Sequence, residues 1–181
     1  MADKHGATQP RKRSRIRIVV LTLITVIGLL VAGLAIAGQQ YHGPRTLAAV
    51  TKAMPGVPLF PFAAIAPSNP AAQRLLAVPL LLMRLQGVRE AEAVFLQVPA
   101  DREFVLDWYR RAAPYQDWIK LQEAPSNGGT RLVYARNREV LQIIVGRTKG
   151  GIVTPIELIY LNGVSDAQIS RLQAQGRVGV Q

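Results

Sequence analysis

The feature that most constrains this chain is an uncharged, apolar stretch near its N-terminus, Ile18–Gly38. Only Thr22 and Thr25 within it are polar, and a helical threonine can bond its hydroxyl to a preceding carbonyl of the same helix. At 1.5 Å per residue, a helix of this length spans about 30 Å, the thickness of a bilayer's hydrocarbon core. A soluble helix this long would need a polar face, and this stretch has none. We therefore expect one transmembrane helix over residues 18–38.

Basic residues precede this stretch and set the expected orientation. Residues 1–17 carry a net charge of +5, out of +11 for the whole chain. The topogenic cluster consists of Arg11, Lys12, Arg13, Arg15 and Arg17. Such residues stay on the cytoplasmic side, so we expect a single-pass protein of the cytoplasmic membrane with its C-terminal domain outside. A basic run can also bind nucleic acid, but its position beside an apolar helix favours the topogenic interpretation, and we expect no nucleic-acid partner.

A cleaved signal peptide is the alternative interpretation of the same segment. Ala35-Ile36-Ala37 is a small-x-small cleavage site, although the apolar stretch exceeds the 7–15 residues typical of signal sequences. Cleavage after Ala37 would release a secreted ligand-binding domain. Both interpretations place the remaining chain outside the cytoplasm.

Composition and the positions of prolines and glycines divide the chain into five parts. Half of the 12 prolines lie between residues 39 and 70, which predicts an extended linker with a short helix over Thr46–Met54. The expected parts are a cytoplasmic tail (1–17), a transmembrane helix (18–38), a proline-rich linker (39–70), an α+β domain (71–163) and a short C-terminal helix and tail (164–181).

Hydrophobic periodicity within residues 71–163 predicts an antiparallel sheet with one main helix packed on one face. Alternation towards Val98 indicates a strand, and Asp101 is a good N-cap for a helix whose apolar face would hold Phe104, Val105, Trp108, Tyr109 and Ala112. The remaining expected strands are 118–121, 130–135, 140–145 and 156–160. Short turns separate them, so consecutive strands should be antiparallel neighbours.

Two flanking helices are also expected from local signals. The first begins at Pro70, and Pro79 should end it. The second begins with the capping box of Ser165 and Gln168, and Gly176 should stop it.

The composition narrows the chemistry that the domain can perform. There is no cysteine, and both histidines, His5 and His42, lie outside residues 71–163. We expect no catalytic residue, no metal site and no cofactor in the domain. An enzyme that uses carboxylates alone is a third hypothesis, but the acids at the helix start, Asp101, Glu103 and Asp107, fit capping and ion pairing better. Glu157 should be solvated.

Five cations near the expected hairpins are candidates for contact with anionic lipid headgroups or an anionic polymer: Arg131, Arg136, Arg138, Arg147 and Lys149. The alternative is an ordinary solvated sheet face with protected edges.

Four large aromatics are expected to fill the core between helix and sheet: Trp108, Tyr109, Trp118 and Tyr134.

A proline-rich motif, Pro58-Leu59-Phe60-Pro61, is followed by Trp108-Tyr109 in the expected helix, by Asp117-Trp118, and by a hairpin from Thr130. This order resembles a group of small bacterial exported or membrane-anchored α+β domains, over about residues 58–161. The group's pattern has glycine where this chain has Asp117. The resemblance implies architecture and location in the bacterial cell envelope, and it implies no chemistry.

These observations predict a membrane-tethered extracytoplasmic module that is not an enzyme. Its expected partners are the lipid bilayer and an envelope protein or anionic polymer. The exposed sheet face and the apolar Leu80–Leu85 segment are the expected contact surfaces.

Overall fold

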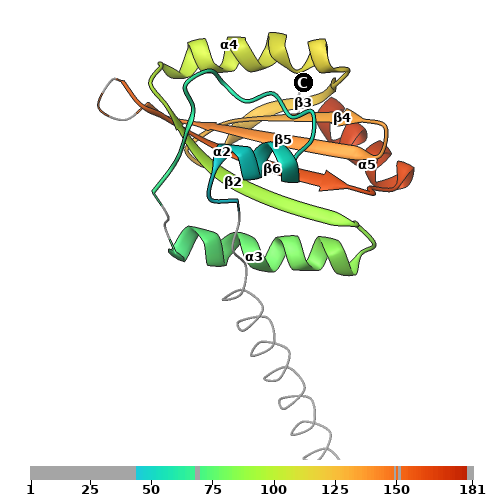
Figure 1. Ribbon diagram of the computed structural model, residues 1–181. Coiled ribbons are helices and arrows are strands. Elements are labelled where there is room, and N and C mark those ends of the chain that lie inside the picture. Colours follow the sequence, from blue (N-terminus) through green and yellow to red (C-terminus); the bar gives the residue numbers. More distant parts are fainter. Residues whose placement is uncertain (1–43, 68–69, 149, 151, 179–181) are drawn as a thin grey trace, which may run out of the picture.

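The computed structural model describes residues 44–67, 70–148, 150 and 152–178. These residues form an α+β unit with an antiparallel sheet, as the sequence predicts (Figure 1). The sheet has six strands, one more than the sequence predicts, because the chain before residue 70 adds the short strand β1 (Ala64–Ile65). The predicted transmembrane helix, the topogenic cations and Lys149 lie outside the described residues. Within the described part of the chain, no helix is long and apolar enough to cross a membrane.

The sheet has the strand order β1-β2-β6-β5-β4-β3. Four strands, β3 to β6, follow each other through short connections and pair with their sequence neighbours, while β2 lies beside β6. The strands are β1 (Ala64–Ile65), β2 (Glu90–Val98), β3 (Ile119–Ser126), β4 (Gly129–Arg136), β5 (Glu139–Gly146) and β6 (Thr154–Asn162). The strand predicted at 118–121 is longer in the structure. Pro125 and Ser126 belong to β3, and the turn begins after them.

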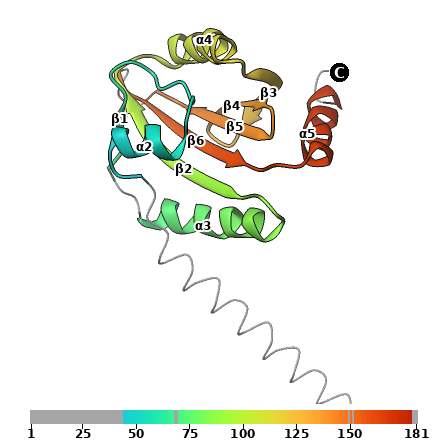
Figure 2. The ribbon, with the colours of Figure 1, turned by 45° about the vertical axis from the view of Figure 1, so that its right-hand side comes forward.

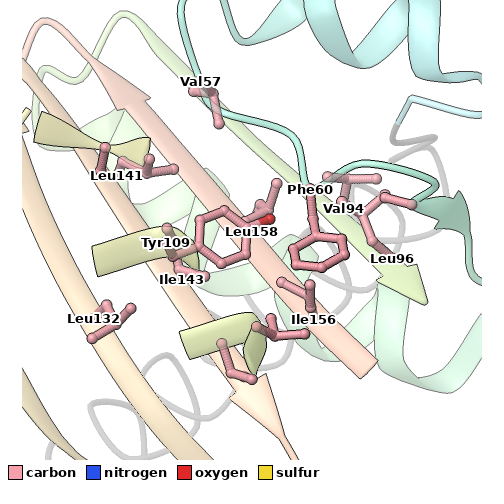
Figure 3. Packing of buried hydrophobic residues seen from close by; sticks show 14 of the residues in the cluster. Val57, Phe60, Val94, Leu96, Tyr109, Leu132, Leu141, Ile143, Ile156 and Leu158 are labelled. Atoms are coloured by element: carbon pink, nitrogen blue, oxygen red, sulfur yellow. The ribbon is translucent and has the colours of Figure 1, made fainter. Parts of the chain in front are cut away.

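One face of the sheet, which we call the closed face, is fully covered. Side chains alternate along the strands, so Leu141, Ile143 and Leu158 point to this face and are completely buried. Figure 3 shows Tyr109 of α4 (Arg102–Ala112) packed over these three residues. Of the four aromatics expected in the core, Tyr109, Trp118 and Tyr134 are buried and Trp108 is partly buried against them, which confirms that expectation.

The start of α4 agrees with the sequence, but its buried face differs slightly. The Asp101 side chain accepts a hydrogen bond from the Phe104 amide at 3.0 Å, which confirms the predicted N-cap. Val105, Leu106 and Tyr109 are the buried residues of the helix, whereas Phe104 is about half exposed. Phe104 instead contacts Phe60 edge-on, with 5.9 Å between ring centroids. The helix is thus rotated towards Leu106 relative to the prediction.

The proline-rich segment before residue 70 takes part in the core. The predicted short helix is present as α2 (Leu47–Ala53), capped by the Thr46 hydroxyl. Val50, Met54 and Phe60 are buried in the same cluster as the closed face. The segment is therefore more than a linker, because its apolar residues complete the cover that α4 begins.

The other face of the sheet carries two helices that the sequence predicted without assigning them to a face. α3 (Pro70–Leu85) packs against β2, and α5 (Asp166–Val178) packs against β3. The expectation of one main packed helix is wrong, because apolar residues on this face also need cover. They form a second cluster: Leu80, Val88, Ala91, Ala93, Val133, Val140 and Val164.

Two predicted helix ends are also wrong. α3 continues through Pro79 to Leu85, and α5 continues past Gly176. Proline removes one backbone hydrogen bond and bends a helix, but it does not forbid the next turn. Here Pro79 is exposed while Leu80, directly after it, is buried against β2, so packing holds the second half of α3 in place.

Asp117 has a backbone conformation that is uncommon for a residue other than glycine. It follows the short 3-10 helix η1 (Pro114–Gln116) and adopts a left-handed conformation with φ 62° and ψ 18°. Glycine enters this region freely, and aspartate is one of the few other residues that tolerate it.

Candidate functional site

The candidate site is the part of the second sheet face that neither α3 nor α5 covers. α3 lies against β2 and α5 against β3, which are separated in the sheet by β6, β5 and β4. Figure 2 shows α4 and α3 on opposite sides of the sheet and α5 well apart from α3. We call the half-buried side chains left between the two helices the open face: Phe95, Arg131, Gln142, Ile144, Glu157 and Ile159.

Strand register places four of these residues in one row across the sheet. Phe95 pairs with Glu157, Glu157 with Ile144, and Ile144 with Arg131. Neighbouring strands are about 4.8 Å apart, so Glu157 and Arg131 lie roughly 10 Å apart at the backbone, on either side of Ile144. The row therefore presents an acid, an aliphatic residue and a base in that order.

Glu157 is the partly buried acid of the row. Burial raises the pKa of its carboxyl above the usual range, and no attractive neighbour counteracts this shift. Among the residues that the structure describes, no cation or hydrogen-bond donor pairs with its side chain. Glu157 lies on the face opposite Ile156 and Leu158, and the prediction that it is solvated holds only in part. Its side chain is partly exposed, with Phe95 and Ile144 beside it on the neighbouring strands.

Arg131 lies at the other end of the row. Its Nη2 donates to the Gln122 amide oxygen of β3 at 3.3 Å, and its Nε is buried without a partner among the described residues. It shares a face with Val133 and points away from Leu132 and Tyr134, as the alternation predicts. The guanidinium therefore has one weak contact within the described chain.

Four of the five predicted anion-contact cations lie within the described residues, and these four do not gather into one patch. Arg131 lies on the open face, whereas Arg136 lies at the end of β4 on the opposite face. Arg138 is in the β4–β5 connection, where its Nε donates to the Val164 carbonyl at 3.3 Å. Arg147 is exposed at the far end of β5. Contact of these residues with an anionic polymer stays a prediction, and it would have to use them singly.

Arg136 has a structural part to play that the sequence did not reveal. Its guanidinium bonds the Glu139 carboxylate at 2.7 Å and the carbonyls of Pro55 and Gln116 at 3.1 and 3.2 Å. It also stacks 4.4 Å from the centre of the Trp118 ring. Through these partners Arg136 connects β4 to the loop after α2 and to η1. Its guanidinium therefore makes its contacts within the protein.

The remaining acids are explained by local structure. Asp101 caps α4, Glu103 pairs with Arg102 at 2.9 Å, and Asp107 pairs with Arg110 on the same helix. Glu123 accepts from Arg110 at 2.6 Å, and this bond lowers the pKa of its carboxyl. Within the described residues no three potential metal ligands cluster together. The open face therefore offers contact chemistry: an apolar strip with one acid and one base.

Comparison with known proteins adds no further guide. No family model matches the chain, and no curated protein matches its sequence.

Proposed function

We propose that this chain is a membrane-tethered extracytoplasmic module that binds another protein of the cell envelope through its open face and catalyses no reaction. The tether rests on the apolar stretch Ile18–Gly38 and the cations before it, which favour lipid and a cytoplasmic N-terminus. The contact function rests on one observation about the domain. Glu157 is a half-buried carboxylate that no described residue neutralises.

An unpaired carboxylate in an apolar strip lowers stability, so a protein that keeps one gains from it elsewhere. A partner that brings an apolar surface and a lysine or arginine would satisfy Glu157 and cover Phe95 and Ile144. Association would then remove both the exposed apolar area and the unpaired charge. This complementarity favours a protein partner over an anionic polymer, which Glu157 would repel.

Crosslinking in intact cells tests the contact. A photo-crosslinking amino acid replaces Ile144 in the full-length chain, and a matched variant carries it at Tyr115, which is exposed beyond α4. We expect a discrete protein adduct from position 144 and none from position 115. Glu157→Lys should abolish the adduct because the like charge repels the partner's cation.

Several outcomes would overturn the proposal. A protease-resistant adduct at position 144 would indicate a polymer ligand. Equal adducts from both positions would show that the open face is not the contact surface. A mature chain that begins at Gly38 in the medium would support the secreted alternative. Turnover by the purified protein that Asp101→Asn or Glu157→Gln abolishes would make it an enzyme.

A further inference from the structure

We propose that the outward face of α3 lies in the boundary between the headgroups and the acyl chains of the membrane that holds the tether. This inference rests on the proposed tether, and it identifies a second surface, separate from the open face. It starts from a conflict between the sequence of α3 and its packing.

The second half of α3 is apolar apart from Arg84, yet only one side of it is covered. Ala77 and Leu80 are buried against β2, and Leu76 and Met83 pack beside them. The outward side carries apolar residues at helical spacing: Val78, Leu81, Leu82 and Leu85. Leu82 is 45% exposed and Leu85 is 74% exposed. A helix that is apolar all round normally has apolar surroundings all round.

The charges around α3 suit a membrane surface. Residues 70–89 contain no acid and three arginines, at positions 74, 84 and 89. Arg84 is half exposed while its Nη2 bonds Glu92 at 3.1 Å, and Arg89 is exposed. Apolar outward residues with cations beside them are the pattern of helices that lie in the interface of anionic bilayers. With 16 residues and a proline inside, α3 itself is too short to span one.

The short connection to the tether brings α3 close to the bilayer. Only residues 39–43 separate the end of the predicted span from Pro44, the first described residue. A connection of this length covers at most about 20 Å when fully extended. Figures 1 and 2 both show the described chain beginning between α2 and α3.

The tether also decides between lipid and other occupants of this face. A short interfacial helix binds lipid weakly on its own, but attachment to the membrane raises its effective concentration at the surface. With α3 on the bilayer, α4 on the opposite side of the sheet points away from it (Figure 2).

Depth-dependent quenching tests the inference. The chain has no cysteine, so one engineered cysteine carries the probe without side reactions. Leu85→Cys and, as the matched control, Tyr115→Cys are labelled with an environment-sensitive fluorophore; both positions are exposed. The labelled full-length chains are reconstituted into phosphatidylglycerol-containing vesicles with lipids spin-labelled near the headgroup. We expect several-fold stronger quenching at position 85 than at position 115, and Leu82→Asp should reduce it to the control level.

The readouts separate this inference from the proposed tether. Chains that float with the vesicles but show equal quenching at both positions would overturn the α3 contact and leave the tether standing. Emission at position 85 that changes with protein density and not with spin-labelled lipid would assign the face to a second copy. Chains that do not float with the vesicles would overturn both.

Discussion

The two faces of the sheet are built from alternate residues of the same strands, yet other elements cover them to different extents. On the closed face, α4, α2 and the segment after it leave Leu141, Ile143 and Leu158 with no exposed surface. On the open face, α3 and α5 cover the sides of the sheet and leave Ile144, Glu157 and Ile159 half exposed. The closed face supplies most of the stability, which leaves the open face free to carry side chains that stability alone would not select.

The largest expected effect compares neighbours on β6 that point to opposite faces. Leu158→Ala removes a completely buried side chain and should lower the free energy of unfolding by about 2–5 kcal/mol. Ile159→Ala on the open face should cost less, about 1 kcal/mol, because its side chain is only partly buried against the second cluster. Urea unfolding of the detergent-solubilised full-length protein measures both. Equal losses would show that the faces do not differ as described.

The second comparison uses two arginines of β4. Arg136→Gln removes an ion pair, three carbonyl contacts and the stack on Trp118, and should cost about 2–3 kcal/mol. Arg131→Gln on the open face loses one 3.3 Å contact and should cost about 0.5 kcal/mol. Thermal unfolding of the two variants gives the difference. A larger loss from Arg131→Gln would mean that the open face is a second structural core.

The third comparison concerns the point where the chain passes from α4 into β3. Asp117→Ala should cost about 1 kcal/mol, because alanine adopts the left-handed conformation poorly. Asp117→Gly should leave stability unchanged or slightly higher, since glycine has no side chain to strain. The melting temperatures of the pair report the backbone effect alone. A glycine variant that loses as much as the alanine variant would show that the aspartate side chain itself matters.

The smallest expected effect has the opposite sign. Because the pKa of Glu157 is raised in the folded state, ionisation of its carboxyl opposes folding at neutral pH. Glu157→Gln should therefore raise the free energy of unfolding at neutral pH. The gain should shrink as pH falls through the raised pKa and vanish below the ordinary range of a glutamate carboxyl. Urea unfolding as a function of pH measures this difference.

Glu103 provides the matched control for that experiment. It is exposed and paired with Arg102, so Glu103→Gln should give no gain at any pH. A Glu157→Gln variant that is less stable than the parent at neutral pH would show that the carboxylate has a favourable partner within the chain. That result would remove the main support for an external cation.

Much of the local structure was predictable because its causes are local. The cap at Asp101 and the capping box of Ser165 and Gln168 occur as expected, the latter with the Ser165 amide donating to the Gln168 side chain at 2.9 Å. Alternation also identified strands β2, β4, β5 and β6, apart from one or two terminal residues. Caps and alternation depend on residues within a few positions of each other.

The candidate site was less predictable, because it depends on what lies across the sheet. Alternation placed Glu157 and Arg131 on the correct face. It could not show that Ile144 lies between them, because strand pairing decides this. The same limit applies to Arg136: spacing along a hairpin cannot show that its guanidinium reaches the carbonyl of Pro55, 81 residues away. Apolar residues at 91, 133 and 140 were the signal for cover on the second face, since a solvated face would not carry them.

The sequence by itself determined the elements of this protein: where strands and helices begin, which side chains share a face, and an apolar stretch that predicts a tether. Only the tertiary structure decided the places of β1 and β2 in the sheet, the continuation of α3 through Pro79, and which part of the second face remains uncovered. Local free energies are set by neighbouring residues, and they can be read along the chain. Burial is set by residues far apart in the sequence, so it becomes defined only when the sheet has assembled.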